Sequence, residues 1–153
     1  MINCHYYHYS DNRIDFLRNN YTQHLFWKPT GFWISKEDSW QNWCKENGFS
    51  KHNLNHCFKH KINFKQDLNL YMCNTLDSLH YLINQYNNDW LDIVEAGFSG
   101  ILFDNYDIIK KCVDITDTKY TWFYGIDVDC CVIWDISKIE IEEIIEIEEQ
   151  VHL

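Results

Sequence analysis

Positions 130–134 read Cys-Cys-Val-Ile-Trp, and this unbroken apolar run limits the structures that the chain can form. Short runs rich in β-branched and aromatic residues are typical of strands buried inside a domain. A helix that crosses a membrane needs about 20 apolar residues in a row, whereas the apolar runs of this chain end after a few residues. We therefore expect a buried strand at 130–134, in a chain without a membrane span.

Strand-like and helix-like segments are interleaved along the rest of the chain. Apolar residues that alternate with polar ones predict strands, whereas spacings of three and four residues predict helices. The expected strands cover residues 4–9, 32–35, 57–64, 68–73, 100–103, 121–124 and 130–134. The expected helices run from 10 or 11 to 17, from a cap at 35 to 44, from 75 or 77 to 86, and from 90 to 95. This order, with hairpin-like stretches such as the two strands joined by residues 65–67, predicts an α+β domain whose sheet is mixed or mostly antiparallel.

The C-terminal residues differ in composition from the rest of the chain. Residues 1–138 contain no repeat, linker or Pro-, Gly- and Ser-rich break, so we expect a single α+β domain there. Residues 139–153 are crowded with glutamate, and their isoleucines fit one side of a helix or, over 139–148, an alternating strand. We favour a helix that packs on the domain or extends from it.

The charge and the cysteines narrow the class of protein. The formal net charge of −10 at pH 7 disfavours a chain that follows a phosphate backbone by charge alone. Lysines and histidines do cluster between Lys51 and Lys65, so a protein that modifies nucleic acid remains one alternative function. The seven cysteines are an odd number with no signal peptide before them, which indicates free thiols in a reducing compartment, the cytoplasm or the nucleus, and we expect the cytoplasm.

One group of side chains has the composition of a ligand pocket. His8, Tyr9 and Ser10 end the first expected strand, and Trp33 and Ser35 lie on the second. If the two strands are neighbours, both serines and the histidine would meet at one rim. Aromatic faces with a few fixed polar groups suit a planar cofactor or base. The plainer alternative is that these aromatic residues only form core.

Two motifs carry a resemblance to a known group of proteins. Residues 28–35 read Lys-Pro-Thr-Gly-Phe-Trp-Ile-Ser, and residues 122–127 read Trp-Phe-Tyr-Gly-Ile-Asp, followed by Ile-Trp at 133–134. Together with His-Tyr-Ser at 8–10, they resemble ADP-ribosyltransferase-like domains. More narrowly, the chain resembles a small family of bacterial and viral domains with K-P-x-G-x-W-x-S and W-Y-Y-G-x-D motifs. The resemblance covers most of residues 5–135 and implies a compact split sheet with flanking helices.

The resemblance implies that the chain binds NAD and uses it as a substrate. In such domains a histidine or arginine on the first strand orients the NAD ribose, and this role falls to His8. An aromatic and hydroxyl-bearing segment on the second strand packs on the nicotinamide side. The residues implied as cofactor contacts are therefore Tyr9, Ser10, Trp33, Ser35 and Tyr124.

A transferase of this type also needs a carboxylate that holds the ribose and stabilises the oxocarbenium-like transition state. The family segment Y-D-G-I-E-I-x-P-Y corresponds to residues 98–106, and its glutamate position is Leu102 in this chain. Asp127, within the late motif, is our first choice for the missing acid, and Asp104 is the second. We expect transfer of ADP-ribose to a macromolecular acceptor or water, with a catalytically degenerate binding module of the same fold as the alternative.

Histidines suggest a second kind of site. His52, His56 and His60 recur every four residues beside Cys57, a spacing that suits zinc or copper on one face of a helix. The segment is otherwise polar, and no second Cys/His pair at zinc-finger spacing accompanies it. We therefore expect a polar connection there and no metal.

The expected ligand is NAD or an ADP-ribose-like molecule, with a protein or nucleic-acid acceptor and no membrane partner.

Overall fold

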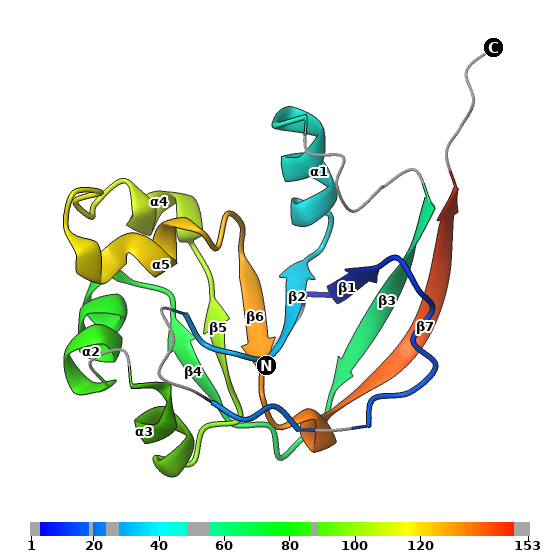
Figure 1. Ribbon diagram of the computed structural model, residues 1–153, viewed down its shortest axis with the longest axis horizontal. Coiled ribbons are helices and arrows are strands. Elements are labelled where there is room, and N and C mark those ends of the chain that lie inside the picture. Colours follow the sequence, from blue (N-terminus) through cyan, green and yellow to red (C-terminus); the bar gives the residue numbers. More distant parts are fainter. Residues whose placement is uncertain (1–3, 19, 24–27, 49–55, 87–88, 149–153) are drawn as a thin grey trace.

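The computed structural model describes residues 4–18, 20–23, 28–48, 56–86 and 89–148 (Figure 1). Its strands are β1 (Tyr6–Ser10), β2 (Phe32–Lys36), β3 (His56–Phe64), β4 (Leu70–Cys73), β5 (Gly100–Phe103), β6 (Cys130–Ile133) and β7 (Ile139–Glu148). Its helices are α1 (Ser39–Glu46), α2 (Leu76–Tyr86), α3 (Trp90–Glu95), α4 (Tyr106–Lys110) and α5 (Thr121–Tyr124), with the 3₁₀ turns η1 (Thr118–Tyr120) and η2 (Ile136–Lys138).

The strands of the described residues form one seven-stranded sheet in the order β4-β5-β6-β2-β1-β3-β7. β4 and β5 run parallel, and the other neighbouring pairs are antiparallel. The expected α+β architecture, with a mostly antiparallel sheet and flanking helices, is confirmed. All four residues of β6 are buried inside the sheet, as the apolar run predicts. No helix in the described ranges is long and apolar enough to cross a membrane.

Each face of the sheet carries its own apolar core. Helices α2 to α5 gather beside β4, β5 and β6 (Figure 1), where Trp90, Phe103 and Trp122 are almost fully buried. The indole of Trp122 lies edge-on to Trp90 and Phe103, with ring centroids 5.1 and 5.9 Å away, a favourable aromatic geometry. The opposite face buries Ile34 among other apolar side chains and is covered by residues 11–18 and by η2.

The sheet opens between β1 and β2. β1 pairs with β3 along its whole length, but within the described chain it pairs with β2 only at its first two residues. Beyond that point the side chain of His8 takes the place of the backbone ladder, because its Nδ1 lies 2.7 Å from the carbonyl oxygen of Trp33. The two strands therefore diverge (Figure 1), and a pocket lies at the point where they part.

The C-terminal segment is a strand, so the favoured helix is wrong for residues 139–148. β7 pairs with β3 along its whole length and belongs to the sheet, not to an appendage of a domain that ends at 138. A register shift opposite Lys61 and Ile62 leaves Glu142 with no residue across from it. This bulge breaks the alternation of isoleucine and glutamate, which is why the sequence fitted a helix as well.

Three further local expectations are wrong. Residues 11–18 are coil and not a helix, and the Ile14 amide donates to Nε2 of His60, 2.9 Å away on β3. Residues 121–124 form α5 and not a strand, since a short apolar run does not distinguish the two. β3 and β4 do not pair across 65–67, because β4 joins β5 at the other end of the sheet.

Candidate functional site

A pocket of about 390 Å³ lies where β1 and β2 part. This volume falls within the range of roughly 300–1,000 Å³ that is usual for small-molecule sites. The pocket is lined by Tyr7, His8, Tyr9, Lys28, Trp33, Ile34, Ser35, Trp40, Gly125, Ile126, Asp127, Val128 and Cys130. Two regions far apart in the sequence therefore meet here: the first two strands and the loop before β6.

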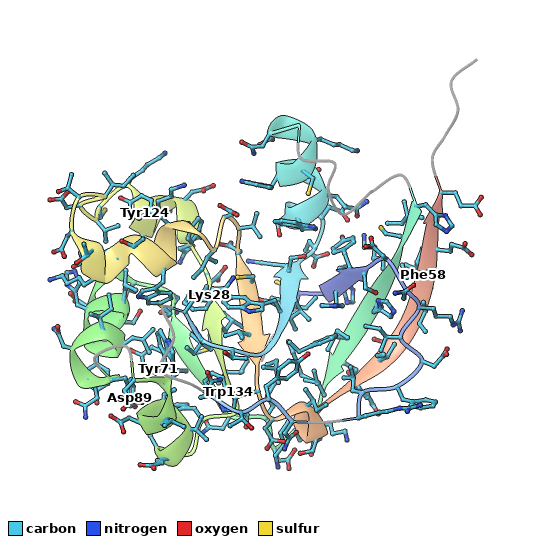
Figure 2. All side chains as sticks on the ribbon, in the orientation of Figure 1. Lys28, Phe58, Tyr71, Asp89, Tyr124 and Trp134 are labelled. Atoms are coloured by element: carbon cyan, nitrogen blue, oxygen red, sulfur yellow. The ribbon has the colours of Figure 1, made fainter. Side chains whose placement is uncertain are left out.

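The pocket brings together five of the residues nominated from the sequence, which are His8, Tyr9, Trp33, Ser35 and Asp127. It does not include Ser10 or Tyr124. Because β1 and β2 are antiparallel, Ser10 lies at the end of β1 away from Ser35, so the two serines do not share a rim. The Tyr124 hydroxyl donates to the carbonyl oxygen of Val113 at 2.7 Å, in the helical layer. Figure 2 shows Lys28 near β6 and β2, and Tyr124 among α4 and α5.

His8 holds a neutral imidazole in the gap between β1 and β2. A carbonyl oxygen can only accept, so the 2.7 Å contact with Trp33 places the proton on Nδ1 and leaves Nε2 as an acceptor. The ring also stacks on Phe32 with a centroid distance of 4.0 Å. Burial lowers the pKa of His8 to about 4, although the hydrogen bond to Trp33 acts in the other direction. At neutral pH the ring is therefore uncharged.

A network behind the tyrosines fixes one wall of the pocket. The Tyr9 hydroxyl donates to Oε1 of Gln41 at 3.0 Å, and Nζ of Lys59 donates to the same oxygen at 2.7 Å. Nζ of Lys59 also lies 4.2 Å from the ring centre of Tyr7 and 3.0 Å from a carboxylate oxygen of Asp38. These contacts come from β1, β3 and the start of α1, and sequence reasoning missed them because they join positions far apart.

The same contacts weaken the nucleic-acid alternative. Lys59 is paired with Asp38, and Lys61 lies 3.8 Å from Glu142. Lys51 and His52 lie outside the described residues. The basic cluster seen in the sequence is thus largely balanced by carboxylates where the structure describes it, and phosphate binding needs unpaired positive charge.

Asp127 supplies the carboxylate of the pocket. It lies three residues before the start of β6 and has a φ of 72°, in the left-handed region that few non-glycine residues adopt. Burial raises the pKa of its carboxyl group, while Lys110 and Lys28 lower it. Lys28 also lies 5.4 Å from the ring centre of Trp33, so a cation, an acid and an aromatic face meet at one side of the pocket.

Asp104, the second choice for the acid, is held in an ion pair outside this pocket. Its carboxylate lies 3.0 Å from Nζ of Lys36, which lowers the pKa of Asp104 against the opposing effect of burial. Asp129, which the sequence did not suggest, accepts a hydrogen bond from the Tyr106 amide at 2.8 Å. Burial, together with the neighbouring Asp104, raises the pKa of Asp129. Lys36, Asp104 and Asp129 thus form a compact charged cluster near the starts of α4 and β6.

A second, open groove adjoins the pocket and shares Asp127 and Val128 with it. Its charged lining residues are Lys36, Glu37, Asp38, Glu46, Asp107, Asp127 and Asp129. Among the described non-glycine residues, those with positive φ are Glu37, Asn105 and Asp127, and all three line this groove. The groove is therefore strongly negative and is built on backbone conformations that cost free energy.

The position of the family glutamate, Leu102, faces away from the pocket. Leu102 is central in β5, is 3% exposed, and packs with Ile34, Cys131 and Ile133 on the opposite face of the sheet. An acid at this position would lie in an apolar interior. The leucine is thus consistent with its surroundings, and the pocket has to draw a carboxylate from another segment.

The histidine set considered for metal does not form on a helix. His56 and His60 lie on β3, where positions four residues apart are separated by roughly 13 Å. Both ring nitrogens of His60 are used, since Nε2 accepts from the Ile14 amide and Nδ1 donates to the carbonyl oxygen of His8 at 3.1 Å. His52 falls outside the described residues. His60 is a fully buried structural residue that joins β3 to the first strand.

Comparison of the chain with known protein families, with curated proteins and with solved structures finds no match. The assignment of a function therefore depends on the geometry and chemistry of the pocket.

The buried histidines predict that the protein loses stability in mild acid. Burial lowers the pKa of both His8 and His60, so the unfolded chain takes up their protons first as the pH falls. Their contribution is complete above about pH 6.5, the ordinary histidine pKa, and each pKa unit of difference is worth about 1.4 kcal/mol. We expect His8 alone to lower the free energy of unfolding by on the order of 2–3 kcal/mol between pH 7 and pH 4.5, and His60 to add to this loss. Urea unfolding at several pH values measures this slope.

A variant separates the histidines from the carboxylates, which also begin to titrate near pH 4.5. His8→Gln removes one titrating group and should flatten the slope, whereas His5→Gln, at an exposed position before β1, should leave it unchanged. An equal slope in wild type and His8→Gln would contradict the assignment of the buried neutral ring.

Proposed function

We propose that this chain binds NAD in the pocket between β1 and β2, cleaves off nicotinamide, and transfers ADP-ribose to a macromolecular acceptor or to water. The observation that carries the proposal is the convergence of His8, Tyr9, Trp33, Ser35 and Asp127 on one pocket. These residues come from separate segments, and they are five of the seven that the resemblance to ADP-ribosyltransferase-like domains nominates. The divergence of β1 from β2 agrees with the split sheet of such domains.

The pocket offers a place for one half of NAD. Its volume of about 390 Å³ suits nicotinamide with its ribose, and the adenosine half would extend beyond it. The aromatic rings of Tyr9 and Trp33 would provide stacking faces for the nicotinamide. Ser35 would offer a hydroxyl near the carboxamide, and Nε2 of His8 would accept a hydrogen bond from a ribose hydroxyl. Lys28 would balance the charge of the pyrophosphate.

The proposed reaction breaks the bond between the ribose anomeric carbon and the nicotinamide nitrogen. The bonding electrons leave with nicotinamide, which becomes neutral, and positive charge develops on the ribose. A carboxylate beside that carbon stabilises the charge in the transition state, and Asp127 would have this role. The acceptor then forms a bond to the anomeric carbon and loses a proton to solvent. The acidic groove beside Asp127 disfavours a nucleic acid as acceptor, because polyanions are repelled there.

A binding module without catalysis is the second candidate. It is favoured by the position of Leu102, which is buried on the face of the sheet opposite to the pocket. With the family glutamate replaced, Asp127 is the carboxylate that lines the pocket among the described residues. If Asp127 does not stabilise the charge that develops on the ribose, the pocket binds its ligand without cleaving it. A module of this kind would bind NAD or an ADP-ribose-like ligand and release no nicotinamide.

Calorimetric titration with NAD and chromatographic detection of nicotinamide test both candidates. We expect wild type to bind NAD and to release nicotinamide. In His8→Ala, turnover should fall about 10- to 100-fold, since a lost buried hydrogen bond to substrate costs roughly 1–3 kcal/mol. His5→Ala, the matched histidine at an exposed position, should behave as wild type.

The outcomes distinguish the transferase from the binding module. Turnover that depends on His8 supports the transferase. Binding of NAD without nicotinamide release supports the binding module. A folded wild-type protein that binds neither NAD nor ADP-ribose would overturn both candidates.

A further inference from the structure

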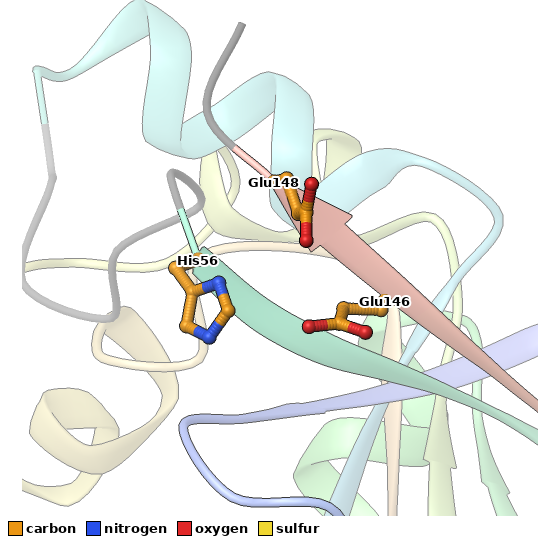
Figure 3. A group of neighbouring side chains, drawn as sticks. All are labelled: His56, Glu146 and Glu148. Atoms are coloured by element: carbon orange, nitrogen blue, oxygen red, sulfur yellow. The ribbon is translucent and has the colours of Figure 1, made fainter.

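We propose that His56, Glu146 and Glu148 form a binding site for a divalent transition-metal ion, with Zn²⁺ as the best-suited ion. The three side chains lie side by side where β3 begins and β7 ends (Figure 3). One ligand atom from each, an imidazole nitrogen and two carboxylate oxygens, lies within 4.8 Å of the other two. The site is separate from the pocket between β1 and β2, and it does not depend on the proposed NAD chemistry.

The pairing of β3 with β7 creates this arrangement. His56 lies directly opposite Glu148, and Phe58 lies opposite Glu146. Glu146 and Glu148 are two residues apart on a strand, so their side chains project from the same face as that of His56. The three ligands are thus held by two hydrogen-bonded strands. The site was not visible in the sequence, because about ninety positions separate the histidine from the glutamates.

The donor set favours zinc over calcium or magnesium. Zn²⁺ binds imidazole nitrogen and carboxylate oxygen at roughly 2.0–2.2 Å, commonly with four ligands in a tetrahedron. Ligand atoms around one such ion lie roughly 3.3–3.6 Å apart, so the three side chains need only small rotations to close on it. Calcium and magnesium prefer sets made of oxygen alone. With three protein ligands, the fourth position is left for water or another small ligand.

The three side chains are also available for an ion. None of them makes a hydrogen bond or ion pair with any other residue that the structure describes, and all three are exposed. Other glutamates of β7 are engaged, since Glu140 accepts from the Asn63 side chain at 2.8 Å and Glu142 lies 3.8 Å from Lys61. Two neighbouring carboxylates repel each other, and a bound cation would remove this repulsion.

Titration with zinc tests the proposal on tag-free protein that has been treated with chelator. Cys112 is an exposed thiol and would bind zinc by itself, so the experiment uses a Cys112→Ser background. We expect one zinc ion to bind and to raise the melting temperature, because the ion joins β3 to β7. Mg²⁺ at the same concentration should have no effect.

Single substitutions locate the ion. His56→Ala and Glu148→Gln should each weaken zinc binding at least about tenfold, since even an outer-shell partner is worth about 10- to 100-fold in metal affinity. Glu143→Gln is the matched control, because Glu143 lies on the same strand and is exposed but projects from the opposite face. Absence of zinc binding, or equal binding by His56→Ala and the control, would overturn the proposal.

Discussion

Asp127→Asn is expected to reduce the release of nicotinamide from NAD at least about 100-fold, since removal of one group that stabilises transition-state charge typically costs 10²–10³ in rate. Binding of NAD should change much less, because the charge on the ribose develops only as nicotinamide leaves. Asparagine keeps the size of the side chain and tolerates the left-handed backbone at this position, where φ is 72°. The substitution thus removes the negative charge with little disturbance of the loop before β6. The measurement is the rate of nicotinamide release together with calorimetric affinity for NAD.

Asp104→Asn is the informative comparison for this prediction. Asp104 is held by Lys36 outside the pocket, so its loss should affect stability more than turnover. Asp107→Asn, at an exposed position in α4, controls for a general change in charge. Loss of turnover in Asp104→Asn with full activity in Asp127→Asn would show that the acid had been assigned to the wrong residue.

Local patterns were enough to predict most of the strands. β6 was predictable because five consecutive apolar residues leave no polar face, and a strand of this kind is buried on both sides. The long helix α2 was predictable because Thr75, a residue type that caps helices, precedes apolar residues at helical spacing. In the structure Thr75 accepts a hydrogen bond from the Ser78 amide at 3.0 Å. In both cases the signal lies within a few residues of the element that it specifies.

The pairing of the strands was not predictable in the same way. Whether residues 139–148 form a helix or a strand depends on β3, which offers its free edge to them, and on the bulge at Glu142. β3 lies far earlier in the sequence, and the neighbouring Glu142 and Glu143 that accompany the bulge fit a helix as well as a strand. In the same way, the turn at 65–67 looked like a hairpin, yet β3 and β4 lie far apart in the sheet.

The same distinction between local patterns and distant contacts applies to the candidate site. His8, Trp33 and Ser35 were nominated because they lie in short motifs, His-Tyr-Ser and Phe-Trp-Ile-Ser, on the first two strands. The contacts that fix them were not, since Gln41 and Lys59 reach the tyrosines from other elements. The shape of the pocket thus depends on pairs of residues that only the three-dimensional structure brings together.

Leu102→Glu is expected to destabilise the protein severely and not to create activity. The substitution restores the residue that the family pattern has at this position, but the side chain lies 3% exposed among Ile34, Cys131 and Ile133. Loss of a buried leucine side chain costs about 2–5 kcal/mol, and an unpaired carboxyl group in an apolar interior adds to that cost. We expect a loss of at least about 3 kcal/mol in the free energy of unfolding, which is a large part of the roughly 5–15 kcal/mol of a typical domain.

Met72→Glu is the matched control, because Met72 lies directly beside Leu102 in the β4–β5 ladder but is 45% exposed. A glutamate there can reach water, so urea unfolding should detect only a small change. If Leu102→Glu instead folded with wild-type stability and released nicotinamide faster, the position would have to face the ligand. Asp127 would then lose its assigned role, since the reaction would draw its carboxylate from β5. The comparison therefore decides whether the family pattern or the observed packing identifies the acid.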